Sequence, residues 1–222
     1  MFNHVESKIP DFLCEQINGE FRTYRINGGE KEYPSITTVL SSQDKPFLTK
    51  WKQRVGHAKA EGIRNQSAHV GSALHDMTEK YLLNESDYSR GVMPNIKELF
   101  FSYKPLIDRI DNVRALERFL YSEELEIAGT VDCIAEFDGK LSIIDFKNSR
   151  KPKKLSYIGD YLIQCNFYAA AYKELTGIQV EQIVIPIAVW GEDPQLFVQK
   201  VSQKKIDKLI KIRQDFWLTH GI

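Results

Sequence analysis

Cysteine is scarce in this 222-residue chain, and its spacing excludes several kinds of site. Cys14, Cys133 and Cys165 form no C-x-x-C pair, so neither a zinc ribbon nor an iron–sulfur cluster is indicated. An odd number of scattered thiols is typical of a protein from a reducing compartment. The start of the chain contains acids and no apolar segment, so we expect neither a secretory signal nor a transit peptide.

Net charge and long apolar runs are also lacking. Lys plus Arg and Asp plus Glu each number 30, so the net charge of zero carries no global nucleic-acid signature, and any site for a polyanion must be local. No apolar stretch approaches the length of a membrane span. With 42% apolar residues, the chain has enough apolar side chains to bury the core of one large domain.

The most informative segment is GTVDCIAEFDGKLSIIDFK, at residues 129–147. The pair Asp138 and Gly139, between two apolar runs, predicts a β-hairpin with a two-residue turn. Counting back along both strands from such a turn places Asp132 directly across from Asp145, where side chains are about 4.5–5.5 Å apart at Cβ. Because two like charges at that distance destabilise a sheet, the pair predicts a bound cation.

Lys147 lies two residues beyond Asp145 and therefore shares its face of the strand. Carboxylates are hard oxygen ligands that suit Mg²⁺ or Mn²⁺ rather than zinc. Such an ion polarises a phosphoryl oxygen and lowers the pKa of a bound water, and a lysine beside it stabilises charge on the phosphate. The alternatives are a solvated hairpin end for Asp132 and Asp145, and one more cation of a basic loop for Lys147.

Apolar spacing predicts the remaining elements. The hairpin strands are apolar on both faces, which favours a sheet covered by helices on both sides, an α/β arrangement. Pro186 inside an apolar strand argues for an edge or a bulge, and residues 1–34 look irregular, with short strands near 21–26. We expect helices at 46–65, 67–83, 96–116, 160–175 and 203–219, the hairpin at about 120–147, and strands at 181–190 and 195–201.

Three polar side chains stand out on the predicted helices. His75 lies beside the apolar stripe of the helix at 67–83, where a lone histidine is more often structural than a ligand. Gln164 and Tyr168 share one face of a helix apolar enough to be buried, so their polar tips need partners. Core hydrogen bonding is one reading, and a face overlooking the metal, with Gln164 orienting Lys147 or the phosphate, is the other.

Basic residues gather in two segments, 50–59 and 147–154. Lys and Arg interleaved with a tryptophan suit single-stranded nucleic acid through phosphate pairing and base stacking, although such runs are commonly solvated faces. Ser35 and Thr37 would donate hydrogen bonds to a phosphate at a helix N-terminus, or simply cap the helix. The candidate nucleic-acid contacts are Ser35, Thr37, Trp51, Lys52, Arg54, Arg150, Lys151, Lys153 and Lys154.

Taken in order along the chain, these motifs resemble a known family. The chain resembles the PD-(D/E)XK nucleases of the RecB type, and within them the mitochondrial genome maintenance exonucleases and their phage relatives. The resemblance rests on a G-x-x-D before I-I-D-F-K, a histidine motif upstream and a Q-x-x-x-Y downstream. The landmarks span residues 35 to about 175. They are SIT at 35–37, WKQR at 51–54, GSALH at 71–75, VRALE at 113–117, DCIAE at 132–136, DFK at 145–147, and Gln164 with Tyr168.

The resemblance implies a fold and a set of roles. The fold is α/β, a restriction-endonuclease-like core with a central mixed β-sheet flanked by helices and a mostly helical N-terminal half. One nuclease domain would span residues 1–222, with the histidine motif in 1–116 and the catalytic hairpin in 117–222. The implied catalytic residues are Asp132, Asp145, Lys147, Gln164 and Tyr168. The implied ligands of Mg²⁺ or Mn²⁺ are His75, Asp132, Asp145 and the Phe146 main-chain oxygen, with Glu117 either a further ligand or part of a surface salt bridge.

The implied activity is hydrolysis of phosphodiester bonds from the ends of single-stranded DNA. The partners would be DNA and proteins of replication or recombination, and the lack of a transit peptide favours the cytoplasm of a bacterium or of a phage-infected cell. Two alternatives stay open. One is an endonuclease that acts on junctions or duplexes, and the other is a DNA-binding module without catalysis.

Overall fold

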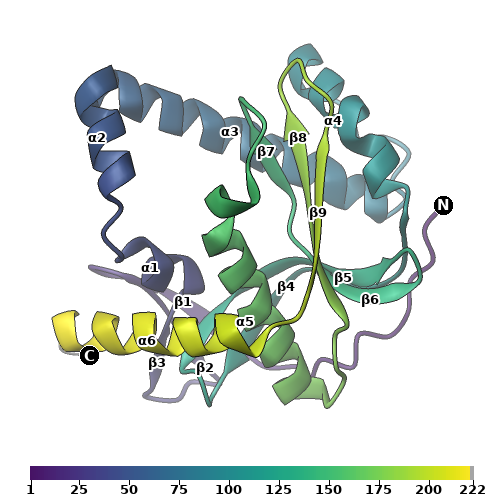
Figure 1. Cartoon of the computed structure of the whole chain (residues 1–222). Coiled ribbons are helices and arrows are strands. Elements are labelled where there is room, and N and C mark those ends of the chain that lie inside the picture. Colours follow the sequence, from purple (N-terminus) through teal and green to yellow (C-terminus); the bar gives the residue numbers. More distant parts are fainter. Residues whose placement is uncertain (221–222) are drawn as a thin grey trace.

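The structure is a computed structural model that describes residues 1–220, without the side chain of residue 47. The first elements are β1 Cys14–Asn18, β2 Arg22–Ile26, β3 Glu32–Pro34, α1 Ile36–Ser41, α2 Pro46–Val55, α3 His57–Leu82 and α4 Pro94–Ile107. The later elements are β4 Ile110–Ser122, β5 Ile127–Phe137, β6 Lys140–Ile144, β7 Lys147–Ser149, the 3₁₀ turn η1 Leu155–Tyr157, α5 Gly159–Thr176, β8 Gln182–Val189, β9 Gln195–Lys200 and α6 Gln203–His220 (Figure 1).

The larger sheet has six strands and mixed directions, as expected for this fold class. Strands β4, β5 and β6 form an antiparallel meander, and β8 pairs in parallel with β6. β7 pairs in parallel with the next part of β8, so β6 and β7 form one line of strand that is interrupted at Asp145 and Phe146. β9 pairs antiparallel with the opposite edge of β8.

The hairpin between β5 and β6 has the register that its turn predicts. Phe137 pairs with Lys140, and the ladder continues to Cys133 opposite Ile144. Both turn residues have positive φ, 51° at Asp138 and 74° at Gly139, which is the conformation of a type I′ turn and explains the Asp-Gly pair. The next position along both strands brings Asp132 opposite Asp145.

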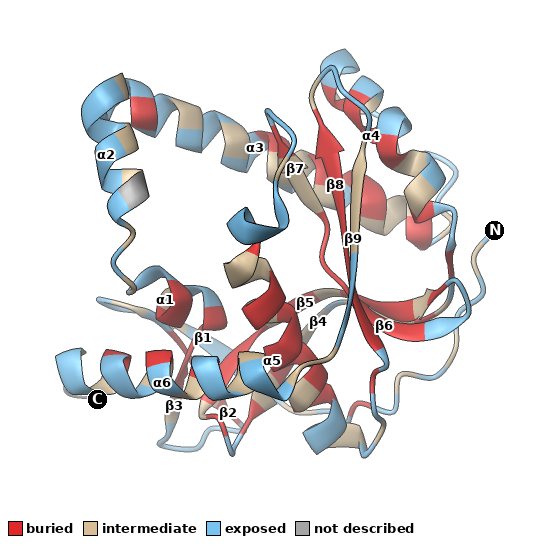
Figure 2. Cartoon of the chain, viewed as in Figure 1, coloured by how far each residue is buried: buried red, intermediate tan, exposed pale blue. Residues whose placement is uncertain are grey.

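Helices cover both faces of the six-stranded sheet. One core joins α1, α5 and α6 to side chains such as Ile143 and Ile185, and the other joins α3 and α4 to side chains such as Ile144 and Val184. Neighbouring residues thus point into opposite cores, which explains the continuous apolar runs. Figure 2 shows the consequence: β8 is buried along its whole length.

The expected helix at 96–116 is wrong in its second half. α4 ends at Ile107, and the chain then enters β4, which contains a bulge between Asp111 and Ala115. The bulge interrupts the alternation of a strand, so the buried residues Ile110 and Val113 are three apart, a spacing that imitates a helix. The segment VRALE at 113–117 therefore belongs to a strand of the central sheet.

Three smaller expectations also need correction. The helix expected at 46–65 is divided at Gly56, whose φ of 89° breaks it, and the second part runs on through 67–83 as the single helix α3. Pro186 lies inside the sheet rather than at an edge, at the position opposite the interruption between β6 and β7. The segment 1–34 is more regular than expected: the short strand near 21–26 is present as β2, and it pairs with β1 and β3 in a three-stranded sheet. None of the helices in residues 1–220 combines the length and apolar character needed to cross a membrane.

Candidate active site

Asp145 directly follows β6, at the interruption in the strand line. Its N–H donates to the carbonyl oxygen of Val184 (3.0 Å), and the residue is only 1% exposed. Across the hairpin, Oδ2 of Asp132 accepts a hydrogen bond from the N–H of Phe146 (2.8 Å). The two carboxylates therefore lie at the same end of the hairpin, as its register predicts.

Lys147 begins β7, and its Nζ lies 2.5 Å from Oδ2 of Asp145. Burial raises the pKa of Asp145, Lys147 opposes that effect, and Asp132 adds to it. Burial lowers the pKa of Lys147, but Asp145 and Asp132 outweigh it and hold the pKa above its usual range, so the ammonium stays charged. No group among the described residues hydrogen-bonds to Oδ1 of Asp145, which is fully buried and needs a partner.

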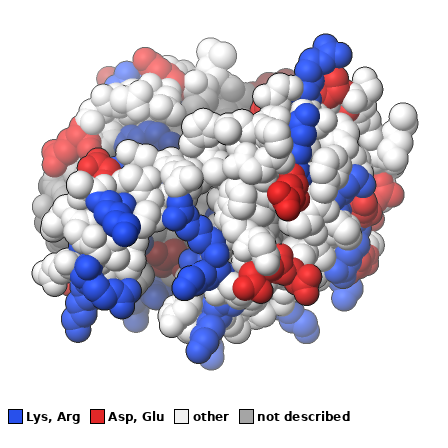
Figure 3. Space-filling model, turned by 90° about the horizontal axis from the view of Figure 1, so that it is seen from above, with Lys and Arg blue, Asp and Glu red and all other residues white. Residues whose placement is uncertain are grey.

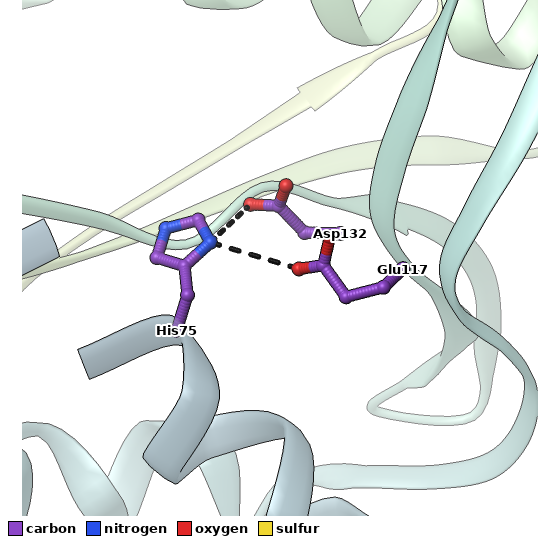
Figure 4. A group of neighbouring side chains, drawn as sticks. All are labelled: His75, Glu117 and Asp132. Atoms are coloured by element: carbon purple, nitrogen blue, oxygen red, sulfur yellow. Dashed lines mark ion pairs between the residues drawn. The ribbon is translucent and has the colours of Figure 1, made fainter. Parts of the chain in front are cut away.

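His75 enters the same site from α3. Its Nε2 lies 2.6 Å from the carbonyl oxygen of Phe146, and because a carbonyl can only accept, Nε2 carries the hydrogen. The other ring nitrogen, Nδ1, faces Oδ2 of Asp132 at 3.6 Å and Oε1 of Glu117 at 3.8 Å (Figure 4). Burial lowers the pKa of His75, but Glu117 and Asp132 outweigh it and raise the pKa above its ordinary value.

Glu117 reaches the site from β4, next to β5 in the sheet. By the register of its neighbours it stands across from Asp132, but its φ of 42° takes it out of the regular strand. A glutamate rarely adopts a positive φ, and such backbone strain is often found at functional sites. Here it accompanies a carboxylate that faces His75.

The site thus has two parts: an inner group of His75, Glu117 and Asp132, and an adjoining pair of Asp145 and Lys147. The ligand atoms of His75, Glu117 and Asp132 all lie within 4.8 Å of one another. Asp145 adjoins this group, but its carboxylate is paired with Lys147. The Phe146 carbonyl oxygen, which was also expected to be a ligand, accepts a hydrogen bond from His75. Two carboxylates and an imidazole, beside a buried carboxylate oxygen without a partner, fit a hard divalent cation such as Mg²⁺ or Mn²⁺.

Two glycines allow the helices to come close to this site. A Cβ on Gly71 would lie 3.3 Å from Oδ1 of Asn148, so glycine lets α3 lie against β7 and bring His75, one turn later, over Phe146. A Cβ on Gly129 would lie 2.9 Å from Cγ2 of Ile36 and 3.0 Å from the hydroxyl of Tyr168. The glycines of both sequence motifs are therefore explained by packing.

Gln164 and Tyr168 contact each other rather than Lys147. Nε2 of Gln164 donates to the hydroxyl of Tyr168 (3.2 Å), whose ring is buried against β5. The residue of α5 that contacts the lysine is Tyr161, one turn earlier, with its ring centroid 5.2 Å from Nζ. Sequence reasoning missed Tyr161, although its place three residues before Gln164 puts it on the same helix face.

The hydroxyls of Ser35 and Thr37 are occupied within the protein. Ser35 is buried and accepts a hydrogen bond from the N–H of Thr38 (3.0 Å), which is helix capping. The exposed side chain of Arg22 donates to both Ser35 (3.2 Å) and Thr37 (2.5 Å). Arg22 is thus a basic residue at this position that sequence reasoning missed.

The two basic segments lie on different elements. Trp51 and Lys52 line a cavity of about 450 Å³ with Arg64 between α2 and α3, and Arg54 is exposed on α2. The other candidates, Arg150, Lys151, Lys153 and Lys154, follow β7 directly and so begin three residues from Lys147. In Figure 3, Lys and Arg form separate groups on the visible face with Asp and Glu between them, in keeping with the zero net charge.

Comparison with known proteins identifies the family. The chain matches the sequence model of the PD-(D/E)XK nuclease superfamily over residues 37–216. The chain belongs to this superfamily. The matched range contains every candidate site residue of this PD-(D/E)XK nuclease except Ser35, and the expected α/β fold class is confirmed.

Curated relatives give a finer comparison for this PD-(D/E)XK nuclease. Mitochondrial genome maintenance exonuclease 1 of Mus musculus is 29% identical over 169 residues, which are 64% of this chain and 50% of the relative. The Homo sapiens protein of the same name is 28% identical over 170 residues, 64% of this chain and 49% of the relative. The chain spans about half the length of these relatives. A solved structure from Eubacterium rectale covers 66% of this chain and 63% of its own, with a TM-score of 0.45 and 12% identity.

Replacing Gly129 with alanine tests the packing of α1 and α5 on β5. Because the added Cβ would overlap Ile36 and Tyr168, we expect Gly129→Ala to lower the free energy of unfolding by about 1–3 kcal/mol in urea titrations. The control is Gly62→Ala in α3, where nothing lies within 4 Å of the added atom and the helix gains about 0.5–1 kcal/mol. Equal effects of the two substitutions would contradict this account of the motif glycine.

Replacing His75 tests the inner group. His75→Gln removes the imidazole that faces Glu117 and Asp132, so we expect Mn²⁺ affinity, measured by calorimetric titration, to fall at least about tenfold. His69→Gln, at an exposed position of the same helix, should leave the affinity unchanged. Unaltered Mn²⁺ binding by His75→Gln would remove the histidine from the metal site.

The raised pKa of His75 also predicts a pH dependence. A metal ion binds neutral imidazole, so protonation competes with it, and a raised pKa starts that competition at a higher pH than usual. We expect Mn²⁺ affinity to decline as the pH falls through the raised pKa of His75. His75→Gln should show a flatter decline, and parallel pH curves for the two proteins would refute the assignment.

Proposed function

We propose that this chain is a Mg²⁺- or Mn²⁺-dependent exodeoxyribonuclease that hydrolyses phosphodiester bonds from the ends of single-stranded DNA, within one nuclease domain. The observation that carries the proposal is the convergence of Asp132, Asp145 and Lys147 at one hairpin end, beside His75 and Glu117. This arrangement joins cation-binding carboxylates to a charged amine, which is what phosphodiester hydrolysis needs.

His75, Glu117 and Asp132 would hold the metal ion, and the buried free oxygen of Asp145 borders the same space. When bound, the ion supplies a polarised phosphoryl oxygen and an activated water. Lys147 keeps its proton because two aspartates raise its pKa, so its ammonium can neutralise charge that develops on the phosphate. The hydrogen bond to the Phe146 carbonyl keeps His75 in the tautomer with a free Nδ1.

One observation favours strand ends, and another favours a single-stranded nucleic acid. The two curated relatives described above are named as exonucleases of genome maintenance. The exposed cations after β7 and the Trp51 cavity offer phosphate and base contacts without a single broad patch. A role in replication, recombination or repair agrees with the relatives' names, and a bacterial or phage origin stays a prediction from the sequence.

The proposal is tested with end-labelled linear single-stranded DNA and a closed circle of the same sequence, each with Mg²⁺, Mn²⁺ or EDTA. We expect progressive loss of the linear strand only with metal, and an intact circle. Lys147→Met should lower the rate by about 10²–10³-fold because the phosphate loses its charged partner. Asp145→Asn should be at least as damaging, and Asp215→Asn, exposed on α6, should act as wild type.

Each other outcome identifies one alternative. Cutting of the circle would show an endonuclease, and a preference for duplexes or junctions would be measured with the same labels. Binding without cutting would show a DNA-binding module, and equal digestion of an RNA strand would remove the restriction to DNA. Full activity of Lys147→Met would exclude the proposed site.

A further inference from the structure

Tyr157 has an unusually exposed ring for an aromatic residue of this protein. It ends η1, directly after the basic loop 150–154, and is 69% exposed. Leu155 beside it is 49% exposed, and Tyr157 makes no ring–ring contact with any described aromatic residue. A single exposed ring is ordinary on a protein surface, so the groups around Tyr157 decide whether it can serve a ligand.

The segment that carries Tyr157 is held in one conformation. Gln195 of β9 bonds Lys153 twice, accepting from its N–H (2.6 Å) and donating to its carbonyl oxygen (3.0 Å). The N–H of Tyr157 donates to the carbonyl oxygen of Lys154 (2.9 Å), and the next residue, Ile158, is fully buried. A ring presented on such a fixed turn loses little entropy when a ligand stacks on it.

The same segment is connected to the reacting centre at both ends. Its start continues β7, whose first residue is Lys147. Its end leads into α5, where Tyr161 places its ring 5.2 Å from Nζ of Lys147. Tyr157 thus lies on the surface, four residues before the tyrosine that contacts the catalytic lysine.

The charges around Tyr157 complement a polyanion. Lys151 and Lys154 are exposed and Lys153 is half-buried, all within six residues of the ring. Cations that pair with phosphates, beside an aromatic ring that stacks on a base, are the two elements of single-strand recognition. An apolar protein segment would use the ring but would leave three lysines without partners.

We propose that Tyr157 is a stacking platform for one unpaired base of the single-stranded DNA bound at the active site, with Lys151, Lys153 and Lys154 on the adjoining phosphates. The stacked base is not the one next to the phosphate that is cut, because the ring that contacts Lys147 is that of Tyr161 and not that of Tyr157. This inference rests on the proposed function, and it adds a residue that the sequence motifs do not contain.

The test measures binding of single-stranded oligonucleotides to the full chain by fluorescence anisotropy in EDTA, so that no strand is cut. Each oligonucleotide carries one abasic residue at a successive position. With the wild type, one position should weaken binding by about 5- to 100-fold. Tyr157→Ala should weaken binding of the intact strand to a similar degree and should abolish the effect of that abasic position, whereas Tyr157→Phe and Tyr157→Trp should preserve it.

Phe101→Ala is the matched control, because Phe101 is a 49% exposed aromatic residue of α4 and lies outside the basic loop. It should leave both the affinity and the abasic profile unchanged. Three results would overturn the stacking site: an unchanged affinity of Tyr157→Ala, an abasic effect that persists in Tyr157→Ala, or an equal loss in Phe101→Ala.

These results are separable from failure of the proposed function. If the wild type digests linear single-stranded DNA and Tyr157→Ala binds it equally well, the nuclease assignment holds and the stacking site is wrong. If the wild type neither cuts nor binds single-stranded DNA, both proposals are wrong. Weaker binding of a duplex than of the single strand is expected, because paired bases cannot stack on the ring.

Discussion

A buried carboxylate at a break in the central sheet is the constraint around which this protein is arranged. Between β6 and β7 the chain leaves its ladder at Asp145 and Phe146, and the backbone groups released there need partners. Val184 bonds the N–H of Asp145, Asp132 bonds the N–H of Phe146, and His75 bonds the Phe146 carbonyl. Two candidate metal ligands therefore also stabilise the break that exposes Asp145 to Lys147.

Close packing of two helices keeps this arrangement in place. α3 approaches β7 at Gly71 and delivers His75, while α5 approaches β5 at Gly129 and delivers Tyr161 to Lys147. Burial then sets the charge states, because Lys147 keeps its proton next to two aspartates while Asp145 is harder to ionise. The electrostatics of the site are thus a consequence of helix packing on the sheet.

Local patterns predicted the hairpin well because its register depends on neighbouring residues. A two-residue turn at Asp138 and Gly139 determines which positions face each other, and period two then places Lys147 beside Asp145. The helix expected at 96–116 failed for an equally local reason, since the bulge in β4 imitates helical spacing. The same bulged strand carries Glu117, whose strained backbone no propensity scale indicates.

The sequence by itself determined the hairpin, its opposed carboxylates, the lysine on their face and the α/β class, because these follow from the two-residue turn, from the period of two along its strands and from apolar periodicity. Only the tertiary structure decided that His75, Glu117 and Asp132 form one group and that Tyr161 rather than Gln164 touches Lys147. Those contacts join elements far apart in the chain, and their distances depend on how closely α3 and α5 pack against the sheet.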